Sequence, residues 1–121
     1  ALAQANGFDE ALRRAQESEA SLDPAQMVRL VDAQGTAMQR ALTPCTPRRG
    51  TIPDAFAVVF RIDASGRTVA AWMKNESAFE ECFAAAMREN LRYVPPTVPF
   101  YTSIIYQRQR SGGSGSEPAE D

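Results

Sequence analysis

The sequence predicts an α+β protein, in which a small three-stranded antiparallel sheet (β-β-α-β) packs against a helix and follows two N-terminal helices. Two periodicities predict this fold. Apolar residues alternate with period two in three segments and recur at helical spacing in three others, and turn-forming or proline-rich stretches separate them. The expected strands are 55–62, 67–73 and 99–108, and the expected helices are 8–19, 24–42 and 78–92.

The first two helices differ in how much apolar surface they offer. The helix over 8–19 is mostly polar, with a thin stripe of Phe8, Leu12 and Ala15, so we expect it to fray or to lie outside the core. Asp23 is placed to cap the second helix, and Pro24 suits its first position. Pro44 is expected to stop that helix.

The hairpin follows a loop rich in Pro, Thr and Arg. Phe56, Val58, Phe60 and Ile62 share one face of its first strand. A turn over 63–66 then ends in Gly66, which can adopt a positive φ.

A capping box, Ser77 with Glu80, begins the third helix. Its apolar face includes Phe79, Phe83 and Met87, which we expect to pack on the Phe56 face of the hairpin. Val94 precedes Pro95, which pushes the chain out of the helical region before the last strand.

The order of these elements resembles the C-terminal domain of the TonB and TolA family of periplasmic energy transducers. The resemblance lies in a hairpin with a Gly turn at Gly66, a helix ending in Arg92-Tyr93-Val94-Pro95, and a final strand over 99–108. It covers about half of the 121 residues. Together with the composition, we expect three parts: a polar helical segment over 1–23, a TonB/TolA-like domain with its preceding helix over 24–110, and a disordered tail over 111–121.

The resemblance implies a periplasmic protein-interaction domain whose edge strand binds an extended segment of an outer-membrane receptor or another envelope protein. A domain-swapped homodimer, which folds with exposed edges can form, is a further expectation. The alternative is a standalone structural or accessory periplasmic protein, in which the N-terminal helices cover the sheet. The expected partner-binding residues all lie on the last strand: Phe100, Tyr101, Thr102, Ser103, Ile104, Ile105 and Tyr106.

Cys45 and Cys82 are the two cysteines of the chain, which contains no histidine. Without further ligands they do not suggest a zinc site. We expect a disulfide, which fits an oxidising compartment, because it would hold the proline-rich stretch around Cys45. The alternative is two separate buried thiols. The Ala-rich start, Ala1 to Ala5, resembles the end of a secretory signal peptide.

Composition and motifs exclude several other classes of function. The formal net charge is −2, with no clustered basic stretch of the kind that nucleic-acid binding requires. The longest apolar run, Ala55 to Phe60, is far shorter than the ~20 residues of a membrane span. No nucleotide-binding or hydrolase motif is present, and the acidic pairs fall at helix starts. We therefore expect no catalytic residues, no cofactor and no metal.

Overall fold

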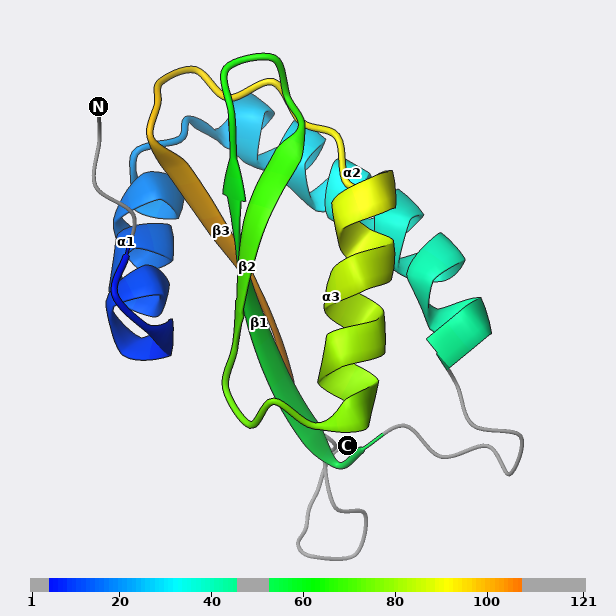
Figure 1. The fold of residues 1–121 in the computed structure, drawn as a ribbon. Coiled ribbons are helices and arrows are strands. Elements are labelled where there is room, and N and C mark those ends of the chain that lie inside the picture. Colours follow the sequence, from blue (N-terminus) through cyan, green and yellow to red (C-terminus); the bar gives the residue numbers. More distant parts are fainter. Residues whose placement is uncertain (1–4, 46–52, 108–121) are drawn as a thin grey trace, which may run out of the picture.

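The computed structural model describes residues 5–45 and 53–107. Three helices and three strands follow one another in these residues (Figure 1). The signal-like start before Ala5, the loop residues 46–52 and the tail expected over 111–121 lie outside the described residues. The elements are α1 (Phe8–Ala20), α2 (Pro24–Cys45), β1 (Ala55–Ile62), β2 (Thr68–Met73), α3 (Ala78–Asn90) and β3 (Phe100–Gln107).

The strands form one antiparallel sheet in the order β2-β1-β3, which confirms the expected α+β class. β1 lies in the centre, so β2 and β3 are the two edge strands. α1 covers one face of the sheet, while α2 and α3 lie side by side on the other (Figure 1). The fold therefore has three layers, and helices cover both faces of the sheet.

The larger core lies between the sheet and the α2–α3 layer. Phe79, Phe83 and Met87 are buried there against the β1 face that carries Phe56, as the two periodicities predict. The ring of Phe56 lies 4.9 Å from that of Phe79 and 5.1 Å from that of Phe83, centroid to centroid. Tilted aromatic contacts at these distances add to the free energy gained by burial.

The smaller core lies under α1, and it shows that our expectation for this helix is wrong. Ala11 and Ala15 are fully buried against Val59 and Tyr101, so α1 is an integral layer of the fold. The small alanine side chains let the helix approach the sheet closely. A thin apolar stripe is enough here because the opposing surface is supplied by large side chains of the strands.

α2 extends further than the sequence suggests, because Pro44 lies inside its last turn and Cys45 ends it. A proline in the last turn removes one backbone hydrogen bond and does not prevent the turn from closing. The side chain of Thr43 donates to the carbonyl of Gln39 in the same turn (3.3 Å). At the other end Asp23 is the predicted cap, with its carboxylate accepting the amide of Gln26 (2.8 Å).

The remaining element limits differ from the expected ones by one or two residues. The third helix ends at Asn90 instead of 92, because Leu91 has extended backbone and Arg92 forms a β-bridge with Arg67. The second and third strands are each shorter than predicted, at Thr68–Met73 and Phe100–Gln107.

Gly66 connects two parts of the sequence that lie far apart. Its φ is +95°, and a Cβ there would lie 3.2 Å from the backbone of Tyr93 and 3.1 Å from the Val94 side chain. The carbonyl of Gly66 accepts the amide of Tyr93 (3.0 Å). The glycine turn and the Arg-Tyr-x-Pro segment are thus packed against each other, and both the conformation and the close approach require glycine.

Candidate partner-binding edges of the sheet

The seven residues predicted to bind a partner all lie on β3, but most of their side chains are inside the protein. Phe100 and Ile104 are buried in the larger core, and Tyr101 is buried in the smaller one. Thr102 is also buried, while Ser103 and Tyr106 are partly buried. Ile105, with 61% of its surface exposed, is the one exposed member. A partner would therefore contact mainly the backbone of this strand.

The backbone amides of β3 point alternately toward the central strand β1 and toward the outer edge. Phe100, Thr102, Ile104 and Tyr106 pair with even-numbered residues of β1, and their amides face that strand. The odd-numbered residues direct their amides outward, as the bonds made by Tyr101 and Ser103 show. The outward donors that a partner strand could use therefore belong to Tyr101, Ser103, Ile105 and Gln107.

Side chains from α1 already occupy the first half of this edge. The amide of Tyr101 donates to the hydroxyl of Ser18 (3.1 Å), and the amide of Ser103 donates to the carboxylate of Glu19 (3.1 Å). Glu19 also accepts the hydroxyl of Thr102 (2.6 Å). From α2, the amide group of Gln34 donates to the Thr102 hydroxyl (2.8 Å). These side chains of α1 and α2 therefore close the β3 edge near Tyr101–Ser103, because they occupy hydrogen-bonding groups that a partner strand would need.

Sequence reasoning missed these closing residues, although one clue was available. Glu17 and Glu19 lie in the last turn of α1, which has no basic residue. Carboxylates are disfavoured at that end of a helix, where the macrodipole is negative. Glu19 is explained by its bonds to β3, which lie outside the helix and could not be inferred from local sequence.

The second half of the β3 edge is more open. The outward amides of Ile105 and Gln107 have no hydrogen-bond partner among residues 5–45 and 53–107. Beside them lies an open depression of about 130 Å³, where β1 and β3 continue past the end of β2. Its lining comes from Ala55, Phe56, Ala57, Lys74, Asn75, Ile105, Tyr106 and Gln107.

The other edge strand, β2, presents the outward groups of Val69, Ala71 and Met73. Their direction follows from Lys74, whose amide donates inward to the carbonyl of Ala57 (3.0 Å). In the part of the chain that the structure describes, one hydrogen bond reaches these outward groups: Arg88 donates to the carbonyl of Val69 (3.2 Å). β2 is therefore the less occupied of the two edges.

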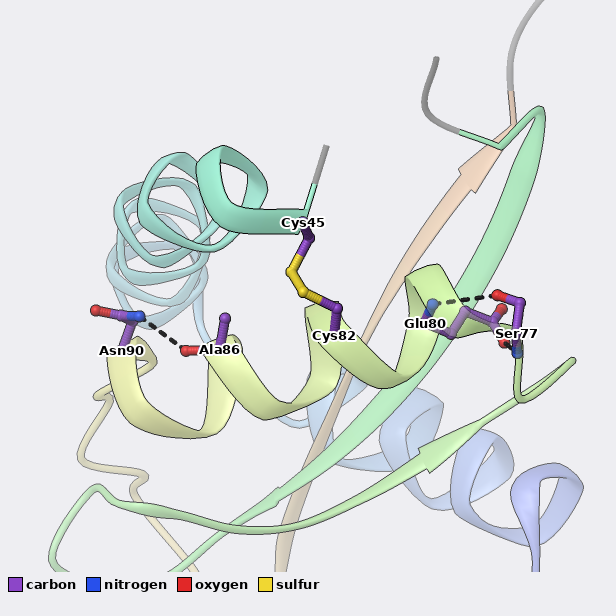
Figure 2. The surroundings of a disulfide bond; sticks show 6 residues. All are labelled: Cys45, Ser77, Glu80, Cys82, Ala86 and Asn90. Carbon is purple, nitrogen blue, oxygen red and sulfur yellow. Dashed lines mark hydrogen bonds between the residues drawn. A yellow bond between two sulfur atoms is a disulfide. The ribbon is translucent and has the colours of Figure 1, made fainter. Parts of the chain in front are cut away.

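Glu80 accepts backbone amides at the point where β2 ends. The sequence identifies it as half of a capping box, and Figure 2 shows its amide donating to the hydroxyl of Ser77 (3.1 Å). Its carboxylate is fully buried and also accepts the backbone amides of Ala57 (3.1 Å) and Asn75 (2.9 Å). A buried carboxylate is tolerated when several donors satisfy it, and here it supplies the acceptor for the amide of Ala57, whose carbonyl is bonded to Lys74.

The predicted disulfide between Cys45 and Cys82 is confirmed. It joins the end of α2 to the middle of α3, with a Cα–Cα distance of 5.6 Å (Figure 2). Both helices belong to the layer that covers the larger core. The bond therefore fixes that layer, and it lies away from the hydrogen bonds that close β3.

A small polar cluster surrounds the ring of Tyr101 on the α1 face. The guanidinium of Arg14 lies 5.6 Å from the ring centroid and donates to Glu10 (2.7 Å). The pKa of Glu10 is lowered, first by the backbone amide of Asn6 and then by Arg14, and the pKa of Arg14 is raised by Glu10. An open depression of about 320 Å³ lies beside this cluster, lined by Arg13, Arg14, Glu17, Ser18, Pro99 and Tyr101. Its arginines already have carboxylate partners, so we assign no ligand to it.

Two further groups with shifted pKa values lie near the hairpin turn. The hydroxyl of Ser65 and the amide of Arg67 bond to Asp63 and lower the pKa of its carboxyl. Burial raises the pKa of the Tyr93 phenol, which donates to the carbonyl of Gln26 (3.4 Å). The shift of Asp63 is accounted for by hydrogen bonds within the turn, and that of Tyr93 by its burial.

Over residues 5–45 and 53–107, no cluster of three acidic, histidine or cysteine side chains is arranged to hold a metal ion. Among the described helices, none has the length and hydropathy of a membrane span. Comparison of the chain with protein-family models, with curated proteins and with solved structures finds no match. The resemblance to the TonB and TolA domain therefore depends on the residues quoted from the sequence.

Proposed function

We propose that this protein is a protein-interaction domain of the bacterial envelope, which binds an extended segment of a partner protein at the open half of the β3 edge. The observation that carries the proposal is the outward amide of Ile105, which lies on an exposed part of an edge strand. An extended segment can add to such an edge through backbone hydrogen bonds. By the resemblance to TonB and TolA, the partner is an outer-membrane receptor or another envelope protein.

The disulfide supports the proposed compartment. Structural disulfides persist in oxidising compartments such as the periplasm and are rare in the cytosol of mesophiles. The bond between Cys45 and Cys82 joins two helices of the core, as a structural disulfide does. We therefore propose a periplasmic location.

The open part of β3 is short, and this limits what the strand can bind. Ser18 and Glu19 occupy the outward amides of Tyr101 and Ser103. A partner that pairs only beyond Ser103 gains few backbone hydrogen bonds, each worth about 1 kcal/mol net. A longer pairing requires the end of α1 to release the strand.

A proline exchange at neighbouring positions tests the proposal. Ile105→Pro removes an outward amide and should leave the sheet folded while it weakens binding. Ile104→Pro removes an amide that faces Val58 of β1, so this matched control should weaken the fold itself. Binding is measured by NMR titration of the labelled protein with a synthetic peptide from the periplasmic segment of an outer-membrane receptor. Peptide-induced shifts that avoid Ile105 and Gln107, or no shifts, would refute docking on β3.

The alternative is a standalone structural or accessory periplasmic protein. The observation that favours it is the closure of β3 by Glu19, since a covered edge is protected against pairing. This alternative predicts that the folded Ile105→Pro variant behaves like the parent protein with every envelope peptide. The gene region upstream of Ala1 offers a second discriminator, because a cleavable signal favours a standalone protein and a membrane helix with a long spacer favours a transducer.

A further inference from the structure

Beyond Val69, the outer edge of β2 lacks the features with which proteins usually protect an edge strand. Natural edges are blunted by charged residues, prolines, bulges or a covering segment. β2 runs from Thr68 to Met73 with neither a charge nor a proline, and its one register shift lies at its start, opposite Arg61/Ile62. The carbonyl of Val69 is held by Arg88, while the outward groups of Ala71 and Met73 have no hydrogen bond to any described residue.

Three arginines gather beside the first half of this edge. Arg67 and Arg92 are bridge partners, and the guanidinium of Arg92 donates to the carbonyl of Arg88 (3.2 Å). Arg88 in turn reaches the carbonyl of Val69 on the edge. All three are exposed, and none has a carboxylate within 4.0 Å among the described residues. We call these residues the arginine cluster.

The position of the cluster is only partly explained by the fold. Arg88 lies in the last turn of α3, where a positive charge complements the helix dipole. That reason does not apply to Arg67, which precedes β2 and is brought to the same place by the hairpin. The gathering of three positive charges is notable in a chain whose formal net charge is −2.

We propose that the β2 edge binds an extended acidic segment of a partner protein. The free amides and carbonyls of Ala71 and Met73 pair with a peptide backbone, which distinguishes a polypeptide from a small anion or a nucleic acid. The arginine cluster faces acidic side chains at the end of that segment that lies beside Val69. The half-buried side chains of Ala71 and Met73 favour apolar residues at alternate positions. This inference concerns the edge opposite to β3 and does not depend on the proposed function.

The probe is a blocked synthetic heptapeptide of alternating valine and glutamate, titrated into the labelled protein and followed by NMR. We expect shifts at the amides of Ala71 and Met73 and at the side-chain signals of the arginine cluster, with Ile105 and Gln107 unchanged. A valine–lysine peptide of the same length is the charge control. The valine–glutamate peptide methylated at its pairing amides is the backbone control, and both controls should fail to bind.

Variants of the protein measure how much the arginine charges contribute to peptide binding, apart from the backbone of the edge strand. Arg88→Gln should raise the Kd by about threefold to fivefold, which is the range of an exposed ion pair. Replacing all three arginines of the cluster by glutamine should raise it by more than tenfold. Arg40→Gln, which removes an exposed arginine of α2, should leave the Kd unchanged. Thermal unfolding of each variant checks that the fold is kept.

Three results would overturn the inference. The first is equal binding of the valine–lysine peptide, which would remove the role of the arginine cluster. The second is a pair of observations: sodium sulfate reproduces the shifts of the arginine side-chain signals, and the peptide leaves the amide signals of Ala71 and Met73 unchanged. The site would then be an anion contact that does not recognise a peptide backbone. The third is the absence of binding at millimolar peptide, or binding confined to Ile105 and Gln107.

Discussion

The two faces of the sheet are covered in different ways. On one face, α2 and α3 bury large side chains such as Phe60, Phe83 and Leu30 and are joined by a disulfide. On the other, α1 packs through the alanines Ala11 and Ala15, and its end is attached to β3 by polar contacts. The difference indicates that the α2–α3 face carries most of the stability, while the α1 face controls access to β3.

The largest expected effect comes from the aromatic packing of the α2–α3 face. Phe83 is fully buried beside Phe56, so Phe83→Ala should lower the free energy of unfolding by about 3–5 kcal/mol. Denaturant unfolding of the parent and the variant measures this loss. A change below ~1 kcal/mol would contradict the assignment of most stability to this face.

The disulfide should contribute a similar amount to the free energy of unfolding. Its cysteines are 37 residues apart, and closing such a loop is worth about 4 kcal/mol in the chain-entropy model. Cys45→Ser and Cys82→Ser should each lose a similar amount, and so should reduction of the parent protein. Ellman titration of the denatured, unreduced protein should find no thiol, and two thiols would refute the bond in the isolated protein.

The close fit of α1 can be tested by enlarging one alanine. Ala15 is fully buried, so Ala15→Leu should overpack the smaller core and cost about 1–3 kcal/mol. Gln16→Leu, at the exposed neighbouring position, is the matched control and should change the stability by less than ~0.5 kcal/mol. If the two variants behave alike in denaturant unfolding, α1 is not closely packed on the sheet.

The substitution with the smallest effect on stability should have the clearest effect on access to the β3 edge. Glu19→Ala removes the acceptor for the amide of Ser103 and should cost about 1 kcal/mol. Native-state hydrogen exchange should become faster at Ser103, while the inward amide of Ile104 should change little. Glu17→Ala, in the same turn but exposed and bonded to Arg13, is the control. Unchanged exchange at Ser103 would mean that Glu19 does not protect the edge.

Much of the fold could be predicted from local sequence. The period-two alternation of Phe56, Val58 and Phe60 and the helical spacing of Phe79 and Phe83 correctly defined the surfaces of the larger core. The capping box at Ser77, the cap at Asp23 and the positive φ of Gly66 were also found. These features depend on residues close together in the chain, where backbone geometry and side-chain type suffice.

The place of α1 and the end of α2 were mispredicted for a common reason. Ala11 and Ala15 form too weak a stripe to indicate burial, and the surface they contact is supplied by Val59 and Tyr101, distant in sequence. Pro44 normally ends a helix, but here α2 continues to Cys45, which is bonded to Cys82. In both cases long-range contacts prevailed over local preference.

The sequence by itself determined which residues form the strands, which faces are apolar and which cysteines pair. Only the tertiary structure decided which edge of the sheet is accessible. The hydrogen bonds from Tyr101 and Ser103 to α1 join residues more than 80 positions apart, and the arginine cluster forms only when the hairpin meets the end of α3. Edge access depends on which donors and acceptors are already satisfied, and that is a property of the packed molecule.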